Sequence, residues 1–424
     1  MLEDCRDGSR FFADRLGRKR ASNPTLSPGS RAADPGKCVC RAWLAPLFQG
    51  VGNFQARGGR LDARFLRPCP FSGAQTAILD RVIRRRLIRL EKFIVRSVDV
   101  GYGYTKFVLG RTPQGDYVCE SFPSVVAFAQ KKTLGGGFFA ERSTLTVLHN
   151  GVEYEVGPDV LLATGAYGSR NLDLGYVQTD TYQILLKGAL KRIGLPRIDV
   201  LVLGAPVATY DQAREYLRRA FSGRIALDRA QEVVVGKVLV LPQPLGGYAW
   251  HGHVSGSYSR IRGQLNLLID PGYFTLDWLV ARGTTIAPAR SGSHPAGMSA
   301  LVRAIASEIS RETGEEVTSL LLWESIERAL YAEEPLHLDG RPYDLTRHLG
   351  AVNQLLAQAA EVLASRVGDA KDIQNVILVG GPARLYEPAL KRALHGKLIQ
   401  IAQDPQFANV KGFQRVGEDI AERL

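Results

Sequence analysis

The sequence has little cysteine outside its first ninety residues, and it has no long apolar run. Four of the five cysteines lie in residues 1–90, and the rest of the chain holds only Cys119. This usage excludes a framework of disulfide bonds and is typical of a reducing cytosol, so we expect a cytoplasmic protein. No apolar stretch approaches the roughly 20 residues of a membrane span, and no secretory signal pattern is evident. We therefore expect no membrane span.

Excess charge is also missing from most of the chain. The formal net charge is +12, but residues 1–90 alone contain 18 Lys and Arg against 7 Asp and Glu. The remaining residues are nearly neutral, so the basic balance gives no argument for nucleic-acid binding by the body of the chain. Direct nucleic-acid binding is expected only through the basic segment.

Residues 1–90 are rich in Arg, Gly, Pro and Ser and show no sustained period, so we expect a mostly disordered extension. Residues 77–90 fit one short basic amphipathic helix, whose charged face could contact DNA, anionic lipid or solvent alone. A further hypothesis is that this segment is a mis-assigned start and not part of the working protein. Its composition is foreign to the body, and the body has no Met before Met298.

The body is organised around residues 94–109, which predict a strand, a tight glycine turn and a second strand. The turn holds Asp99, Gly101, Gly103 and Lys106 in the spacing D-x-G-x-G-x-x-K. Glycines let backbone amides approach a phosphate, a carboxylate can hold hydrated Mg²⁺, and a lysine can meet phosphate oxygens. An ordinary hairpin turn with one exposed lysine is the competing interpretation.

A similar pattern returns at residues 265–280, where Asp270 and Gly272 again separate two apolar runs. This recurrence indicates two halves built on one plan. Two such turns facing each other across a cleft could clamp a polyphosphate and its metal.

The segments between and after the turns predict alternating strands and helices, and hence an α/β fold. Residues 198–207 and 233–240 predict apolar strands. The second strand leads to Gln243, which stands between two prolines and is predicted to be a loop residue held in one position. A strand at 373–379 runs into Gly380-Gly381-Pro382, where bare backbone would let a flat base or sugar approach. Helices are expected at 180–192, 211–221, 296–310, 318–331, 351–367, 385–394 and at the C-terminus.

These motifs, in this order, resemble the actin-like ATPases of the superfamily of actin, heat-shock chaperones and sugar kinases. The form of the second turn and the closing segment 405–412 are similar to the plasmid-segregation (ParM/StbA) type, and more narrowly to the component called PRTRC system protein D. The resemblance covers residues 93–424 and implies an actin-like (ribonuclease H-like) two-domain fold with a nucleotide cleft. Domain I would span 93–263 and domain II 264–404, with the last helix, about 405–424, returning to domain I.

The resemblance also implies roles for individual residues. Asp99 and Asp270 would organise Mg²⁺ through its waters, and Gln243 would position the attacking water. The phosphates of ATP would be bound by Gly101, Gly103, Thr105, Lys106, Gly272 and Thr275, and the adenosine by Gly380, Gly381 and Pro382. Two departures from the family pattern predict slow hydrolysis: Phe274 stands where many members have a small residue, and the neutral Gln243 is a poor base.

By this resemblance we expect a filament-forming, Mg-ATP-dependent ATPase that serves the segregation or maintenance of plasmids or mobile elements. Its partners would be further copies of itself and a DNA-bound adaptor protein. A monomeric ATP-dependent chaperone or small-molecule kinase of the same superfamily is the alternative, with Asp277 as the candidate base of a kinase. A third hypothesis is a DNA-binding protein that acts through the basic segment.

Overall fold

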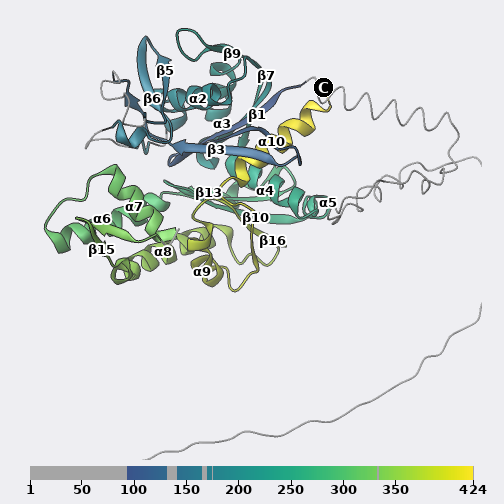
Figure 1. Ribbon diagram of the computed structural model, residues 1–424. Helices are drawn as coiled ribbons and strands as arrows, with labels where there is room; N and C mark the ends of the chain where they lie inside the picture. Colours follow the sequence, from purple (N-terminus) through teal and green to yellow (C-terminus); the bar gives the residue numbers. More distant parts are fainter. Residues whose placement is uncertain (1–92, 131–140, 165–169, 174, 332–333, 424) are drawn as a thin grey trace, which may run out of the picture. The chain divides into compact units, whose positions relative to one another are not determined.

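The computed structural model describes residues 93–130, 141–164, 170–173, 175–331 and 334–423 (Figure 1). The chain divides into two units, residues 1–70 and 71–424, and every described residue belongs to the second. The predictions for residues 1–90, including the basic helix at 77–90, lie outside the described residues.

The first half of the body builds a six-stranded mixed sheet in the order β3-β2-β1-β7-β9-β8. Its strands are β1 (Val95–Val100), β2 (Tyr104–Arg111), β3 (Tyr117–Pro123), β7 (Arg197–Ala205), β8 (Gly223–Ala226) and β9 (Glu232–Pro242). Strand β1 pairs antiparallel with β2, where Asp99 faces Lys106, and parallel with β7. A separate three-stranded sheet contains β4 (Ala127–Phe128), β5 (Leu145–His149) and β6 (Val152–Val156).

The second half repeats this plan with a sheet in the order β12-β11-β10-β16-β17, and β13 also pairs with β11. Its strands are β10 (Leu265–Pro271), β11 (Leu276–Arg282), β12 (Thr285–Ile286), β13 (Gly292–His294), β16 (Asn375–Leu378) and β17 (Ile399–Ile401). Strand β10 pairs antiparallel with β11 and parallel with β16, as β1 does with β2 and β7. The equivalence confirms the prediction of two halves on one plan. A small hairpin, β14 (Leu336–Leu338) and β15 (Arg341–Tyr343), lies outside this sheet.

Helices cover the sheets according to the alternation of side chains along each strand. In β1, Val98 joins the apolar cluster that includes Leu185 of α2, whereas Val95 joins a second cluster with Phe413 of α10. The helices are α2 (Asp180–Ile193), α3 (Tyr210–Ala220), α4 (Gln243–Val254), α5 (Tyr258–Ile261), α6 (Met298–Thr313), α7 (Leu320–Tyr331), α8 (Leu349–Val367), α9 (Ala383–Ala393) and α10 (Ala408–Ala421). The helices predicted within the described residues are all present, within a few residues at their ends.

Helix α4 was not predicted, because its sequence begins Gln243-Pro244 and contains Gly246 and Gly247, which are typical of a loop. Proline is nevertheless well suited to the first turn of a helix, where its missing amide costs nothing. The glycines are required by packing: a β-carbon on Gly412 of α10 would lie 1.7 Å from the carbonyl oxygen of Gly246. The two helices therefore cross in backbone contact.

This crossing joins the two halves of the body (Figure 1). Helix α10 packs against β1 and β7 of the first sheet, and α4 packs against β10 and β11 of the second. The N-termini of both helices reach the boundary between the sheets, where Gln243 begins α4 and Asn409 lies in the first turn of α10.

Candidate functional site

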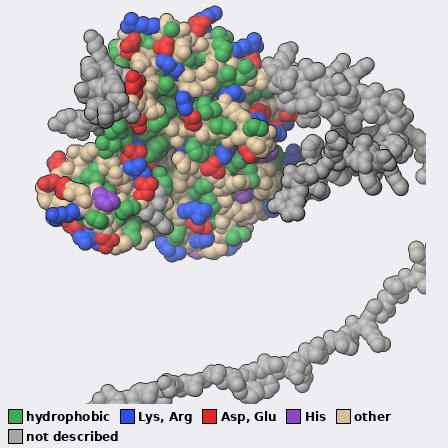
Figure 2. Space-filling model, viewed as in Figure 1, with side chains coloured by type: hydrophobic (Ala, Val, Ile, Leu, Met, Phe, Trp, Pro, Cys, Tyr) green, Lys and Arg blue, Asp and Glu red, His purple; other side chains and the backbone are tan. Residues whose placement is uncertain are grey.

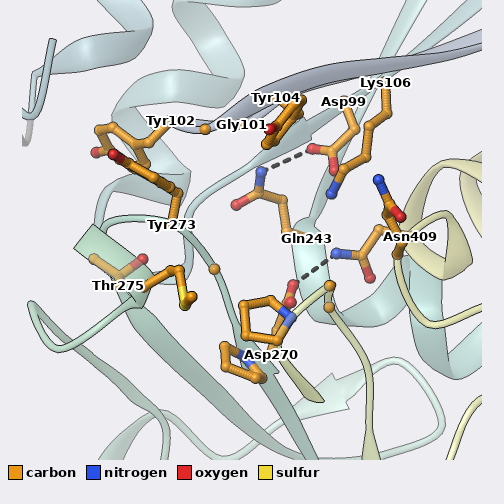
Figure 3. A pocket seen from close by; sticks show the side chains of 18 of the residues that line it. Asp99, Gly101, Tyr102, Tyr104, Lys106, Gln243, Asp270, Tyr273, Thr275 and Asn409 are labelled. Carbon is orange, nitrogen blue, oxygen red and sulfur yellow. Dashed lines mark hydrogen bonds between the residues drawn. The ribbon is translucent and has the colours of Figure 1, made fainter. Parts of the chain in front are cut away.

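A cavity with about 710 Å³ of empty volume, partly open to solvent, lies between the two halves. Every predicted site residue except Thr105 lines it. Figure 3 shows Asp99 and Lys106 on one side and Asp270 on the other, with Gln243 between them. The fold thus brings together residues that are 171 positions apart in the sequence.

The two glycine turns have the same construction. In the first turn the amide of Gly101 donates to the carbonyl oxygen of Tyr104 at 3.2 Å, and in the second the amide of Gly272 donates to that of Thr275 at 2.8 Å. Each hydrogen bond closes its turn, and the backbone amides of the two residues between donor and acceptor take no part in that bond. Backbone amides in such turns form anion-binding concavities.

Neighbouring groups hold the carbonyls of both turns. Ser124 donates from its amide to Gly103 and from its hydroxyl to Gly101, at 2.8 and 2.6 Å. In the second turn, the carbonyls of Gly272 and Tyr273 accept from amides in the first turn of α6 at 3.0 and 2.7 Å. The turns are therefore fixed by the surrounding chain before any ligand binds.

Thr105 occupies a different position from the one expected. Its side chain is fully buried, and its hydroxyl forms a hydrogen bond of 3.0 Å with that of Ser124. Strand alternation puts Thr105 on the opposite face of β2 from Lys106, which lines the cavity. Thr105 thus contacts Ser124, which holds the carbonyls of the turn, and it is not among the residues that line the cavity.

Asp99 lies at the end of β1, where its buried carboxylate accepts a hydrogen bond of 2.8 Å from Nε2 of Gln243. Burial raises the pKa of Asp99, while Lys106 and the bond from Gln243 oppose the shift. Because Nε2 is held by Asp99, Oε1 of Gln243 remains to accept a hydrogen bond. The amide is thereby oriented by the first half of the protein.

Asp270 is the counterpart of Asp99 at the end of β10. Oδ2 of its carboxylate accepts a 2.6 Å hydrogen bond from Nδ2 of Asn409, and a β-carbon on Gly380 would lie 2.5 Å from Oδ1. Burial raises the pKa of Asp270 to about 7; Asn409 opposes the shift, and Asp277 adds to it. Gly380 has a φ of +86°, a conformation that favours glycine, so two constraints require glycine beside Asp270.

The charge of the cavity wall favours a bound cation. Asp99, Asp270, Asp277 and Glu327 line it, and Lys106 is the only cation among the described lining residues. Burial raises the pKa of all four carboxyl groups, and a divalent cation beside them would favour their charged forms and would also offset the charge of bound phosphates. Within the described residues, no group of three or more His, Cys, Asp or Glu could hold a metal ion. Asp99 and Asp270 are oxygen donors of the kind that Mg²⁺ uses when it keeps several waters and binds through few carboxylates plus phosphates.

Sequence reasoning gave no site role to several lining residues, among them Asn409, Glu327 and Tyr331. Asn409 connects β10 with α4 at the cavity, because its side chain donates to Asp270 and accepts from the amide of Gly247 at 3.0 Å. Its signal was only a polar residue at the start of an apolar helix. Glu327 follows Ile326 on the buried face of α7, and a charge at such a position is a recognisable signal.

The body shows no dominance of one charge on the face seen in Figure 2, where basic and acidic side chains are interspersed over the described part. Among the described residues, no helix combines the length and apolar character needed to cross a membrane.

Two equivalent sheets, each with a glycine turn that faces one shared cavity, define an actin-like fold, and comparison with known families gives the same result. Residues 97–246 match the family of the N-terminal domain of actin-like proteins. Residues 268–392 match the C-terminal family of archaeal actin homologues, MreB-like. The chain therefore has an actin-like fold, and the fold prediction is confirmed. No curated protein matches the chain.

Solved structures share this fold at low sequence identity. The archaeal actin homolog Ta0583, in complex with ADP, has a TM-score of 0.61 and 21% identity, over 78% of this chain and 100% of that chain. A ParM filament from Clostridium botulinum has a TM-score of 0.62 and 19% identity, over 77% and 99%. An Alp12 filament has a TM-score of 0.52 and 14% identity, over 78% and 99%.

Proposed function

We propose that this protein is an Mg-ATP-dependent, filament-forming actin-like ATPase that serves the segregation or maintenance of plasmids or mobile elements. The observation that carries the proposal is the pair of equivalent turns, with Asp99 and Asp270 in the wall of one cavity. An actin homolog in complex with ADP and filaments of ParM and Alp12 share the fold, which supports nucleotide binding and self-association. This proposal includes the narrower resemblance to PRTRC system protein D, a cytoplasmic location and a DNA-bound adaptor.

The residues present suit hydrolysis by positioning rather than by covalent chemistry. The turn amides and Lys106 would bind the phosphates, and Gly380, Gly381 and Pro382 would line the adenosine. Asp99 and Asp270 would hold Mg²⁺ through its waters, and the bound ion would neutralise phosphate charge. Gln243, whose Nε2 is held by Asp99, would accept a hydrogen bond from the attacking water at Oε1. The start of α4 contributes the positive end of a helix dipole at the same place.

A small-molecule kinase remains the second candidate, because Asp277 lines the cavity as a buried carboxylate and accepts a 2.6 Å bond from Thr275. ADP release that depends on an added small-molecule substrate would favour this alternative. Hydrolysis of ATP with water alone, coupled to assembly, would favour the filament.

The test is assembly of the purified full chain, followed by light scattering, pelleting and electron microscopy with Mg-ATP, Mg-ADP or no nucleotide. We expect filaments with Mg-ATP and fewer or none with Mg-ADP. The matched variant is Asp270→Ala, which should abolish nucleotide-dependent assembly. Nucleotide binding without assembly in any state would reject the filament and leave the fold unaffected.

Removal of residues 1–90 tests the hypothesis of DNA binding through the basic segment. Salt-sensitive DNA binding that disappears on this truncation would assign the binding to that segment.

A further inference from the structure

A cluster of buried charged and aromatic side chains joins the two halves beside the cavity. Arg170 and Tyr104 come from the first half, and Tyr273, Glu324 and Glu327 come from the second. The side chains of Arg170 and Glu327 are each only 5% exposed, although charged residues are almost never buried unless paired. No role in phosphate or metal binding accounts for Arg170, which is not among the residues that line the cavity.

The contacts of Arg170 cross from one half to the other. Its Nη1 lies 3.5 Å from Oε2 of Glu327, and its guanidinium stacks over the ring of Tyr273 at 4.2 Å. On the near side it lies 5.5 Å from the ring of Tyr104, whose hydroxyl donates to Glu324 at 3.3 Å. Cation–π contacts gain strength when they are removed from water, so this cluster is more than a surface ion pair.

The cluster and the helix crossing hold the halves together at two different sides of the cavity. Figure 3 shows Tyr273 on one side and Asn409, in the first turn of α10, on the other. At the crossing the two backbones are in contact, with a β-carbon on Gly412 excluded by Gly246. Backbone contact of this kind does not open without unpacking two helices. The cluster is held by side-chain contacts, which can break by rotation of those side chains, so it is the side at which a ligand can leave.

Three residues of the cluster, Tyr104, Tyr273 and Glu327, also line the cavity. Tyr273 belongs to the second glycine turn, so an Arg170 that is stacked on its ring couples that turn to the first half. Opening of the cluster therefore moves a wall of the site itself.

We propose that Arg170 is a clasp residue that closes the cavity over a bound nucleotide by its contacts with Glu327 and Tyr273, and thereby sets the rate of nucleotide release. The inference rests on the proposed nucleotide binding. Arg170 acts on retention and positioning, and it takes no part in the chemical step. Its removal speeds dissociation, because these contacts must break before a bound nucleotide can leave on this side.

The test compares Arg170→Met and Glu327→Gln, singly and together, in the full chain. A matched control is Arg142→Met, because Arg142 also pairs with a buried glutamate, Glu155, at 3.3 Å, but entirely within the first half. Stopped-flow release of a fluorescent ADP analogue is expected to be at least about tenfold faster for Arg170→Met. The double variant should release the nucleotide little faster than Arg170→Met alone, since both substitutions remove the contact between Arg170 and Glu327. Release from the Arg142→Met control should remain close to wild type.

Hydrogen exchange of the nucleotide-free protein supplies a second readout that does not depend on nucleotide binding. Arg170→Met should increase exchange in residues 271–275 and in α7, whereas Arg142→Met should not. Unchanged release and unchanged exchange in Arg170→Met, with only a lower unfolding temperature, would overturn the clasp. A wild-type chain that binds no nucleotide would overturn the proposed function, and the exchange measurement would still decide whether Arg170 holds the halves together.

Discussion

Gly103 on the first turn lies in direct contact with Tyr273 on the second turn. A β-carbon built on Gly103 would come within 2.6 Å of the β-carbon of Tyr273, a separation that real β-carbons essentially never show. Tyr102, beside Gly103, meets Phe274 edge-on, with ring centroids 5.0 Å apart. The second glycine of the first motif therefore permits the approach of the two halves, in addition to any role in phosphate binding.

Gly103→Ala tests this contact. The added methyl group should push the two turns apart, destabilise the protein by about 1–3 kcal/mol, and weaken nucleotide binding. Isothermal titration calorimetry and chemical denaturation would measure the two effects. The control is Gly110→Ala in β2, the strand that follows the turn, where the nearest atom to an added β-carbon is a guanidinium nitrogen of Arg96 at 3.9 Å. Equal effects of the two substitutions would show that the contact with Tyr273 has no special importance.

Gln243→Ala should lower the rate constant for ATP hydrolysis by up to roughly 100-fold, because the attacking water loses its oriented acceptor. Nucleotide affinity should change far less, since the turns and Lys106 remain. Single-turnover hydrolysis and equilibrium binding of ADP separate the two quantities. A variant that hydrolyses ATP at the wild-type rate would remove Gln243 from the proposed mechanism.

Asp270 predicts a pH dependence of stability in the protein without nucleotide or metal. Burial raises its pKa from the ordinary value of 3.8 to about 7, so between these pH values the folded state holds a proton that the unfolded state has already lost. The stability from this group is complete below pH about 4, decreases as the pH rises from about 4 to about 7, and stays low above that window. The total change is up to about 4 kcal/mol, at 1.36 kcal/mol per pKa unit.

Asp270→Asn removes this titration and serves as the reference. Denaturation at several pH values gives the unfolding free energy of each protein. As the pH rises from about 4 to about 7, the unfolding free energy of the wild type should fall relative to that of the variant. Comparison of the two proteins cancels the titration of the other buried carboxylates to first order. A difference that stays flat from pH 4 to pH 8 would mean that Asp270 is ionised in the folded protein throughout.

Thr105 and Thr275 offer a paired test, because both are buried threonines beside or within a glycine turn but only Thr275 lines the cavity. Thr105→Val should cost about 1 kcal/mol of stability and leave nucleotide affinity unchanged, since Ser124 keeps its bond to Gly101. Thr275→Val removes the donor to the buried carboxylate of Asp277 and should reduce both stability and affinity. A lower nucleotide affinity in Thr105→Val would support the phosphate contact that the motif predicts for Thr105.

The two turns could be predicted from sequence because their signal is local. Asp99 and Asp270 are each followed two residues later by glycine and are flanked by apolar runs, and the strand pairing follows from that pattern. The cavity residues could be assigned because motif order, more than any single motif, specifies this fold. Thr105 was assigned to the phosphates together with Lys106, although neighbouring residues of a strand point to opposite faces.

Other features depend on contacts between distant segments, and no local pattern contains them. Gly246 reads as a loop residue until Gly412, far along the chain, requires its bare backbone. Arg170 stands in a connection with no motif, and only the folded chain places it against Glu327. Such contacts define the helix crossing and the clasp, so they emerge only with tertiary structure.

The central claim is that one nucleotide, with its metal, binds between the two glycine turns. The most direct measurement is a crystal structure of the full chain grown with Mg²⁺ and a non-hydrolysable ATP analogue. The account predicts the phosphates between the turns at Gly101 and Gly272, with the metal and its waters beside Asp99 and Asp270. A nucleotide bound elsewhere, or a cavity that remains without nucleotide at saturating concentration, would contradict it.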